Sequence, residues 1–432
     1  MVCCRSHLPL LACVLYSIAA RAVDDGFIRD QNQCLARNTT PLPNETITWT
    51  GGCKEGYEDG DGVQQWYTNG ELGSRYEGHM AKGVPDGFGK SVRRDGQTYE
   101  GEFRDGRRYG HGIMTSVDGT RYEGQWRDGF LEGRAVIFTR AGDRYEGETR
   151  NNRLNGNGVA TWANGEHYEG DWVDNNMEGR GVIAYPNGSR YEGEFKKRLP
   201  SGKGTRTDPQ GNKFEGTFEA GLQIGKGVAT FTNGNRYEGE FTKGKMSGVG
   251  ILVWANGGRY SGGFKDNQFH GPAVLITPDG SRLEGNWKDG LLEGPGVAVY
   301  ATGERFEGEF HANRRNGFGV ATNKDGAKYE GGWKDDRADG KGTLMVPGAL
   351  TFEGQFRMGA KEGEGTVLFR NGVRLTATWK NNLLDGKGVY LYPNGDRVEV
   401  EFESGRLIRR SGPPNSLPPD RELLKPPGSG QI

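Results

Sequence analysis

Acidic side chains recur at even intervals along the chain and are the first groups that could do chemistry. Glu100, Glu123 and Glu146 stand 23 residues apart. Hydrolysis of a glycosidic bond needs two carboxyl groups that face each other across a cleft. Single acids at a constant spacing instead fall on the same side of successive structural elements, where they form a solvated row. The acids therefore give no reason to predict a hydrolase.

Other residues with chemical potential have the same regular origin. Asp59 to Gly62 resembles the start of a calcium-binding loop, but the remaining ligands and the bidentate Glu are absent. Glycine pairs such as Gly179 and Gly181 resemble phosphate-binding loops, but no third glycine and no helix follow. The six His residues share neither a common position nor a metal-like spacing. We predict that the chain is not an enzyme and has no catalytic, metal-binding or cofactor-binding residues.

The charge of the chain is balanced. Lys and Arg total 56 and Asp and Glu total 57, for a net charge of −1. Binding to nucleic acid phosphates or to anionic lipids favours clustered basic residues. The clusters at 104–108 and 196–198 are short, and acids lie among them. We therefore expect no nucleic acid partner and no simple electrostatic attachment to a membrane.

The regular spacing comes from a tandem repeat. We number each repeat from its first residue, position 0, which is usually aromatic. Fifteen starts keep an unbroken step of 23 residues, and a sixteenth repeat begins at Trp49 with four extra residues before the next start. The fifteen starts are Tyr76, Tyr99, Tyr122, Tyr145, Tyr168, Tyr191, Phe214, Tyr237, Tyr260, Leu283, Phe306, Tyr329, Phe352, Leu375 and Val398. A fixed period of this length indicates a repeat architecture.

The start of each repeat has the pattern of a half-buried strand. Positions 0, 2 and 4 are aromatic, glycine and bulky, as in Tyr168, Gly170 and Trp172, and they share one strand face. The glycine should leave room for rings from neighbouring strands. Position 7 is Gly, Asn or Asp in nearly every repeat, which indicates a turn residue with positive φ. Arg198 is the exception, and we expect it to be strained or locally rebuilt.

A second strand is predicted at positions 14–17, for example at 182–185. Asn-Gly pairs such as Asn187 and Gly188 follow it at positions 19 and 20. Asn-Gly between two apolar runs favours a type I′ hairpin turn, which needs positive φ twice. Each repeat should therefore contribute two antiparallel strands. The predicted fold is all-β: an elongated repeat rod of stacked antiparallel β-hairpins in a single twisted meander sheet.

The pattern Tyr-Glu-Gly-x-Trp/Phe, followed by glycines at positions 7, 11 and 13, resembles the MORN repeat (membrane occupation and recognition nexus). The resemblance covers about residues 49–405 of the chain, and we place the whole array at 49–410. It implies a rod-like antiparallel sheet, open at its ends, that acts as a scaffold or binding surface. It does not imply a reaction.

Residues 1–22 have the features of a secretory signal peptide. Arg5 supplies the positive start, an apolar run covers 8–20, and the sequence 20–22 fits a cleavage site before Val23. The alternatives are a buried N-terminal helix and a bacterial lipoprotein signal, because 10–13 resembles a lipobox. Export to the periplasm or the extracellular space is the prediction.

Cys34 and Cys53 are the only cysteines left after such a cleavage. In an oxidising compartment they are expected to form a disulfide, and two free buried thiols are the alternative. The bridge would fasten residues 23–48, a predicted capping segment, over the first strands. The region from Cys34 to Cys53 also resembles the start of exported bacterial MORN-array proteins.

The segment after the array is predicted to be disordered. Residues 411–432 are rich in Pro, Gly and Ser and lack an apolar pattern. Asn38, Asn44 and Asn187 each start a glycosylation tripeptide, which matters only in a eukaryotic secretory pathway.

Position 17 is aromatic in half of the repeats and is the candidate binding ladder. Its residues are Trp66, Trp162, Tyr185, Phe231, Trp254, Tyr300, Phe369 and Tyr392. Aligned rings could hold an extended peptide, a glycan or a lipid chain, whereas buried packing is the alternative reading. We predict a non-enzymatic exported scaffold or binding protein that engages a protein or cell-envelope partner. A protein that binds lipid or membrane surfaces, or a glycan-binding protein, is the alternative.

Overall fold

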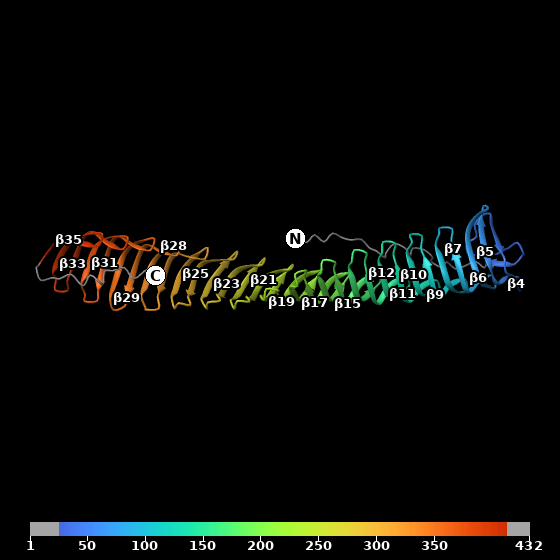
Figure 1. Ribbon diagram of the computed structural model, residues 1–432, viewed down its shortest axis with the longest axis horizontal. Coiled ribbons are helices and arrows are strands. Elements are labelled where there is room, and N and C mark those ends of the chain that lie inside the picture. Colours follow the sequence, from blue (N-terminus) through green and yellow to red (C-terminus); the bar gives the residue numbers. More distant parts are fainter. Residues whose placement is uncertain (1–25, 413–432) are drawn as a thin grey trace. The chain divides into compact units, whose positions relative to one another are not determined.

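The computed structural model describes residues 26–412, so the predicted signal peptide at 1–22 and residues 413–432 of the predicted tail lie outside the described residues. The described residues form 35 β-strands and no helix (Figure 1). The chain divides into two compact units, Met1–Leu222 and Gln223–Ile432.

The strands of the first unit are β1 (Phe27–Arg29), β2 (Leu35–Arg37), β3 (Glu45–Trp49), β4 (Gly52–Lys54), β5 (Tyr57–Thr68), β6 (Glu71–Ala81), β7 (Val84–Val92), β8 (Thr98–Arg104), β9 (Arg107–Thr115), β10 (Arg121–Arg127), β11 (Phe130–Phe138), β12 (Arg144–Arg150), β13 (Arg153–Thr161), β14 (His167–Val173), β15 (Asn176–Ala184), β16 (Arg190–Lys196), β17 (Leu199–Thr207) and β18 (Lys213–Glu219).

The remaining strands are β19 (Leu222–Thr230), β20 (Arg236–Thr242), β21 (Lys245–Val253), β22 (Arg259–Lys265), β23 (Gln268–Ile276), β24 (Arg282–Lys288), β25 (Leu291–Val299), β26 (Arg305–His311), β27 (Arg314–Thr322), β28 (Lys328–Lys334), β29 (Arg337–Val346), β30 (Leu350–Arg357), β31 (Ala360–Phe369), β32 (Arg374–Lys380), β33 (Leu383–Leu391), β34 (Arg397–Glu403) and β35 (Arg406–Ser411).

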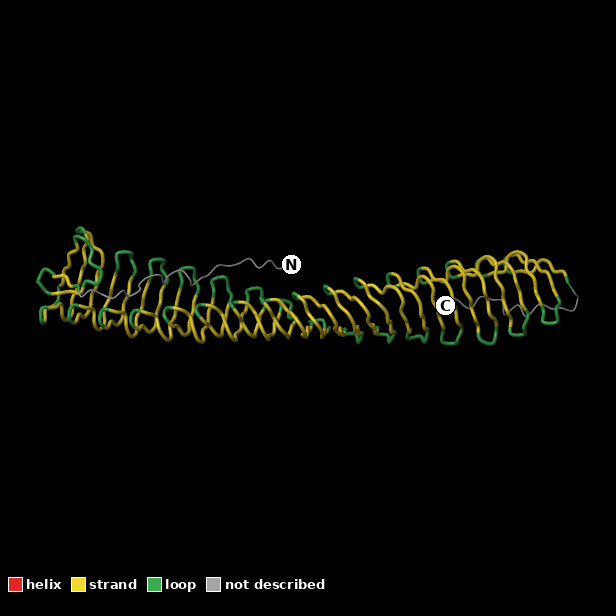
Figure 2. The backbone as a smooth tube through the Cα atoms, turned by 180° about the vertical axis from the view of Figure 1, so that it is seen from behind, coloured by secondary structure: helices red, strands yellow, loops and turns green. Residues whose placement is uncertain are grey.

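Within each unit, strands that follow one another in the sequence pair with each other in an antiparallel sense. This holds from β5 to β18 in the first unit, as in the β14–β15 and β15–β16 pairs. It holds again from β19 to β35 in the second unit. Figure 2 shows the strands of each unit side by side, joined by short turns. The predicted all-β meander of stacked antiparallel hairpins is confirmed.

The second strand of each repeat is longer than predicted. In the repeat that starts at Tyr168 it is β15, which spans positions 8–16 rather than 14–17. Gly179 at position 11 does not end the strand, because it forms a β-bulge. Gly170 pairs with Gly181 and Trp172 pairs with Met177, so three residues of β15 lie opposite one residue of β14. Such bulges accept a left-handed glycine, and Gly179 has a φ of 80°.

The type I′ turn lies at the other end of the hairpin from the predicted one. Asp174 (φ 47°) and Asn175 (φ 67°) both have positive φ and join β14 to β15, as a type I′ turn requires. At Asn187 and Gly188 only the glycine is left-handed, with a φ of 85°. The N–H of Tyr185 donates to Ser189 O at 2.8 Å, which leaves a three-residue loop. Such a loop needs one left-handed residue rather than two, so the type I′ prediction for positions 19 and 20 was wrong.

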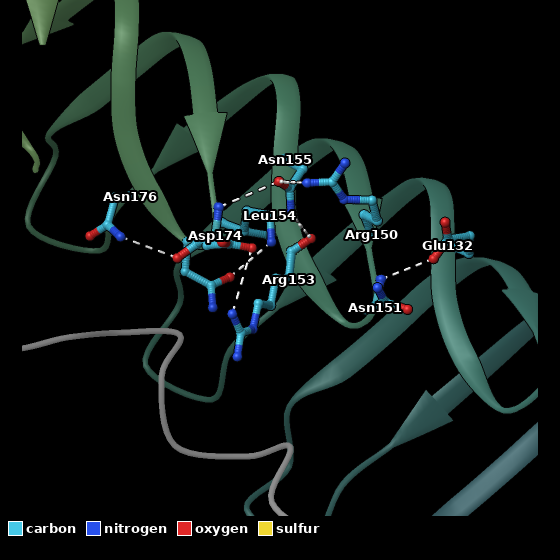
Figure 3. Close-up of polar contacts among 9 residues, drawn as sticks. Glu132, Arg150, Asn151, Arg153, Leu154, Asn155, Asp174 and Asn176 are labelled. Carbon is cyan, nitrogen blue, oxygen red and sulfur yellow. Dashed lines mark hydrogen bonds and ion pairs between the residues drawn. The ribbon is translucent and has the colours of Figure 1, made fainter. Parts of the chain in front are cut away.

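Position 7 is left-handed as predicted, and its Asn side chains link neighbouring repeats. Leu154 N donates to Asn175 Oδ1 at 2.8 Å, and in the preceding turn Asn151 N donates to Glu132 Oε2 at 2.9 Å (Figure 3). Arg198 keeps the same turn with a φ of 70° and is not rebuilt. Its Nη2 donates to Asn175 O at 3.2 Å, so its side chain also contacts the preceding repeat, but as a donor rather than as the acceptor that Asn provides.

The core consists of rings that lie on the glycines of their own repeat. Tyr168 Oη donates to Asp171 O at 3.0 Å. A Cβ on Gly181 would lie 2.5 Å from that Oη, and a Cβ on Gly170 would lie 2.5 Å from the Cα of Gly181. The room at position 2 is therefore taken by the repeat's own ring and by the next strand's backbone, not by rings from neighbouring strands as predicted. Trp172 then packs edge to face on Tyr168, with 5.3 Å between ring centroids.

The N-terminal edge differs from the repeats. β2 pairs with β1 and, in parallel, with β5, while β3 and β4 pair with β5 in an antiparallel sense. The structure contains the Cys34–Cys53 disulfide, with 5.8 Å between the Cα atoms. It joins the segment before the array to β4. The described part of the predicted capping segment, residues 26–48, thus lies on the first strands of the array.

Candidate functional site

The outer face of the array is built from alternate residues of every strand. It carries positions −1, 1 and 3 of the first strand of each repeat and positions 12, 14 and 16 of the second. Arg190 and Glu192 occupy positions −1 and 1, and their side chains form an ion pair at 2.7 Å. Equivalent pairs in other repeats are Arg75–Glu77, Arg121–Glu123, Arg144–Glu146, Arg236–Glu238, Arg282–Glu284, Arg305–Glu307, Lys328–Glu330 and Arg397–Glu399.

These ion pairs neutralise the charges of the outer face but contribute little to the stability of the fold. An exposed ion pair contributes about 0–1 kcal/mol, and the side chains of Arg190 and Glu192 are 50% and 57% exposed. Val182 lies between Glu169 and Glu192 in the register, and in most repeats an aliphatic residue at position 14 alternates in this way with the acids across the strands. The predicted wet face is thus a charge-balanced surface with aliphatic rows between the charges.

The candidate ladder lies at the ends of strands rather than within them. Trp162, Tyr185, Phe231, Trp254, Tyr300 and Tyr392 each begin the loop that follows a strand, whereas Trp66 and Phe369 lie in β5 and β31. Phe369 is buried, with 2% of its surface exposed, and the other seven are partly buried. Trp254 packs edge to face on Phe269, with 6.1 Å between centroids. The rings therefore combine a packing contact with a surface that solvent reaches.

The repeat itself matches a known family model. The MORN repeat model matches fourteen segments: 76–98, 99–121, 122–144, 145–167, 168–190, 191–213, 214–236, 237–259, 260–282, 284–305, 306–328, 329–345, 352–374 and 376–397. The chain belongs to the MORN-repeat family. The repeats that we place at Trp49 and Val398 lie outside these segments. A MORN array is typical of repeat-based binding scaffolds without catalytic activity.

No curated protein matches the chain. Among solved structures, the chain is similar to the TCP domain of Drosophila melanogaster SAS-4 in complex with a proline-rich motif of Ana2. The identity is 11%, with 46% of this chain and 90% of that chain covered, and the TM-score is 0.23. For the TCP10 domain of Danio rerio CPAP, the identity is 12%, the coverage 69% and 98%, and the TM-score 0.11.

A third similar structure is virginiamycin B lyase from Staphylococcus aureus. The identity is 13%, with 67% of this chain and 83% of that chain covered, and the TM-score is 0.12. At TM-scores this low, we draw nothing about the MORN array from any of the three.

Between residues 26 and 412, no group of three or more His, Cys, Asp or Glu side chains is placed to hold a metal ion. Within the same residues, no helix is long and apolar enough to span a membrane.

Position 9 of the MORN repeats holds three cations that the sequence analysis missed. Most repeats have Leu, Met or another uncharged residue there, but Arg108, Arg315 and Lys361 lie over aromatic rings instead. The guanidinium of Arg108 is 4.3 Å from the Trp126 centroid, and that of Arg315 is 4.2 Å from the Trp333 centroid. Burial lowers the pKa of Arg108 to about 10 and that of Lys361 to about 8. The signal in the sequence that could have revealed these cations is a charged residue at position 9, which is uncharged in most repeats.

A second missed feature is a pair of buried acids beside the disulfide. Asp30 Oδ1 accepts the N–H groups of Asn32 and Cys34, both at 2.8 Å. Glu58 is fully buried and accepts Gln64 Nε2 at 2.5 Å. Burial raises the pKa of Glu58 to about 7, against the hydrogen bond from Gln64, and the charge of Asp30 adds to the rise. Asp30 lies before the array, and Glu58 stands at position 9 of the first repeat, where most repeats have an uncharged residue.

Proposed function

We propose that this chain is an exported, non-enzymatic scaffold that uses its MORN array to bind a protein or cell-envelope partner. The observation that carries the proposal is the outer face. Its residues recur from repeat to repeat, and its charges are paired within each strand, as with Arg236 and Glu238 at 2.8 Å. A surface of this kind offers many equivalent contacts and no reactive groups.

Export is supported by the apolar run at 8–20, the cleavage pattern before Val23 and the Cys34–Cys53 bridge. The test is the intact mass of the protein made in its native host, with and without reductant. We expect a chain that starts at Val23 and gains about 2 Da on reduction, the two hydrogens of the opened disulfide. A chain that keeps Met1 and has free thiols would contradict export.

The partner is more consistent with a protein than with an anionic lipid. Nine of the repeats pair the basic residue at position −1 with the acid two residues later, so these bases are not free to attract phosphate headgroups. Sedimentation with phosphatidylserine vesicles tests this. We expect no binding, whereas binding that is lost above about 0.3 M salt would favour the membrane-surface alternative.

The candidate ladder is proposed as a second contact row, because its rings at Trp162, Trp254 and Tyr300 are partly accessible at the turns. Stacking of sugars on these rings is the basis of the glycan-binding alternative. The glycan-binding alternative is tested by adding soluble oligosaccharides to the protein and following the fluorescence of its indole rings. An unchanged spectrum would contradict this alternative.

A further inference from the structure

The outer face changes character over three strands of the second unit. In the repeat that starts at Tyr260, position 1 is Ser261 instead of Glu, and position 3 is Gly263 instead of an acid or amide. The register places Ile251 of β21 and Val274 of β23 on either side of Ser261. We call Val249, Ile251, Val253, Ser261, Val274 and Ile276 the β21–β23 patch.

The β21–β23 patch joins the aliphatic residues that most repeats have at positions 14 and 16 to an aliphatic residue at position 12 and to Ser261 in place of Glu. Val249 stands at position 12 and is 68% exposed, and Val253 is 36% exposed. Position 12 is basic in several other repeats, as at Lys203, Lys226 and Lys341, and it carries an exposed Phe at Phe88 and Phe318. Single exposed aliphatic residues are ordinary on protein surfaces, but a contiguous group on one face indicates an interaction site.

Arg259 borders the patch and lacks the acid that most of its equivalents have. The register places it between Val253 and Ile276. On the neighbouring strands, Arg236 pairs with Glu238 at 2.8 Å and Arg282 pairs with Glu284 at 2.5 Å. Arg259 has Ser261 at that place and forms no ion pair with any residue in the described part of the chain. An exposed guanidinium beside an aliphatic surface can receive a carboxylate in a bidentate manner.

We propose that the β21–β23 patch docks a segment of a partner protein that presents aliphatic side chains beside a carboxylate. This inference rests on the proposed function, because it assigns that function to one place on the array. The aliphatic side chains of the segment would cover Val249, Ile251 and Val274, and its carboxylate would pair with Arg259.

The dimensions and the bordering charges favour a protein segment over a membrane. Three strands spaced about 4.8 Å apart present a strip roughly 10–14 Å wide, close to the width of one helix. Glu238 and Glu284 line the two sides of the strip, and their side chains are 59% and 52% exposed. Because Arg236 and Arg282 neutralise these acids, the strip offers a broad anionic surface little beyond the single guanidinium of Arg259, whereas the one carboxylate of a narrow segment needs only that group.

The same array contains a matched control. Thr376 also replaces the Glu at position 1, beside Arg374. The neighbouring strand β31 carries Glu364 and Thr366 at positions 12 and 14, where β21 has Val249 and Ile251, and Thr366 Oγ1 lies 3.1 Å from Thr376 Oγ1. This second site lacks the acid at position 1, as the β21–β23 patch does, but it also lacks the aliphatic side chains at positions 12 and 14.

The test is a selection from a displayed library of random peptides on the full chain, followed by affinity measurement of the enriched peptides by biolayer interferometry. The key variant is Ser261→Glu, which gives Arg259 the carboxylate that other repeats have and should leave the fold intact. We expect enriched peptides that combine Asp or Glu with aliphatic residues. Ser261→Glu should weaken them at least about tenfold, and so should Val249→Lys, while Thr376→Glu should change affinity less than about twofold.

Other results overturn the inference in distinguishable ways. Enriched peptides that bind Ser261→Glu as tightly as the natural chain would place binding elsewhere on the array, and the proposed function would stand without this patch. A selection that enriches no peptide would count against both. Binding of phosphatidylserine vesicles that Ser261→Glu abolishes would make the occupant a membrane rather than a protein.

Discussion

The N-terminal edge and the interior repeats of the first unit are stabilised in different ways. At the edge each contact occurs once: the Cys34–Cys53 bridge, the buried Glu58, and Gln31 Nε2, which donates to Trp49 O at 2.6 Å. In the interior each contact recurs. The position 0 hydroxyls of Tyr145 and Tyr168 donate to the position 3 carbonyl oxygens at 2.8 and 3.0 Å.

This difference predicts where the fold is sensitive. In a repeat array stability is close to a sum of repeat and interface terms, so one altered repeat is supported by its neighbours. The edge has neighbours on one side only, and its disulfide and buried acid respond to reductant and pH. We therefore expect reductant or a change in pH to destabilise the edge locally, while the interior repeats stay folded.

Removing the disulfide should have the largest effect. A bridge that closes a separation of 19 residues stabilises by about 3 kcal/mol. In a variant with both Cys34→Ser and Cys53→Ser, we expect faster hydrogen exchange in β1–β5 and unchanged exchange in β14 and β15. Reduced natural protein should behave in the same way. A uniform loss of protection along the first unit would contradict the separation of edge from interior.

The edge should also loosen as the pH rises. The pKa of Glu58 is raised from 4.5 to about 7, so the fold favours its protonated form. The stability that this provides is complete below pH 4.5 and is lost as the pH rises through about 7. At about 1.4 kcal/mol per pKa unit the loss amounts to up to about 3 kcal/mol.

The measurement is hydrogen exchange of β5 between pH 5 and 8, corrected for the intrinsic exchange rate. Glu58→Gln should abolish the pH dependence, because the amide stays neutral throughout. Glu102→Gln, at an exposed acid of β8, is the matched control and should leave the dependence in place. Persistence of the dependence in Glu58→Gln would assign it to another group.

Within the interior, Lys361 is a charged residue at a position that is uncharged in most repeats, and we expect it to lower the stability of the fold. It is buried, and burial lowers its pKa to about 8, so below that pH the fold carries a poorly solvated charge. The nearby Trp379 ring, 4.8 Å away, offsets part of this cost. We expect Lys361→Leu, the residue found at Leu384, to raise stability at pH 7 by about 1–2 kcal/mol in urea denaturation.

The natural chain should gain stability between pH 8 and 10, where Lys361 loses its proton in the folded state, and the same variant should remove this gain. Lys387→Leu, at an exposed position 12, serves as the control and should change neither property. A loss of stability in Lys361→Leu would mean that the cation–ring contact outweighs the burial of the charge.

The repeat period predicted the all-β meander because its glycines and aromatics stand at fixed positions. The strand limits were less predictable. Gly179 reads as a break in the sequence, yet the carboxylate of Asp171 accepts the N–H of Arg180 at 2.8 Å and stabilises a bulge that continues the strand. Asn187 and Gly188 read as a two-residue turn, yet the hydrogen bond from Tyr185 to Ser189 sets a longer loop.

Departures from the repeat were the least predictable from a single sequence. Ser261, Arg315 and Lys361 each stand where the repeat has another residue type, but only the register and the burial show which departures face solvent and which lie in the core. The candidate ladder shows the same limit, because the period aligned its residues and placed all of them in strands, whereas in most repeats the strand ends one residue earlier.

The smallest predicted effect lies at one turn of the interior. Arg198 has a φ of 70°, a conformation that costs a side chain other than Gly, Asn or Asp about 1 kcal/mol. Its Nη2 recovers part of that cost by donating to Asn175 O at 3.2 Å. Arg198→Asn restores the residue that Asn152 and Asn175 provide at the same position. It should also allow an amide oxygen to accept the N–H of Met177, as Asn175 accepts that of Leu154.

We expect stability to rise by about 0.5–1 kcal/mol in urea denaturation, with slower exchange confined to the turn between β16 and β17. Arg180→Asn, at an exposed position 12, should leave both unchanged, and a loss of stability in Arg198→Asn would show that the guanidinium contact is worth more than the relief of backbone strain.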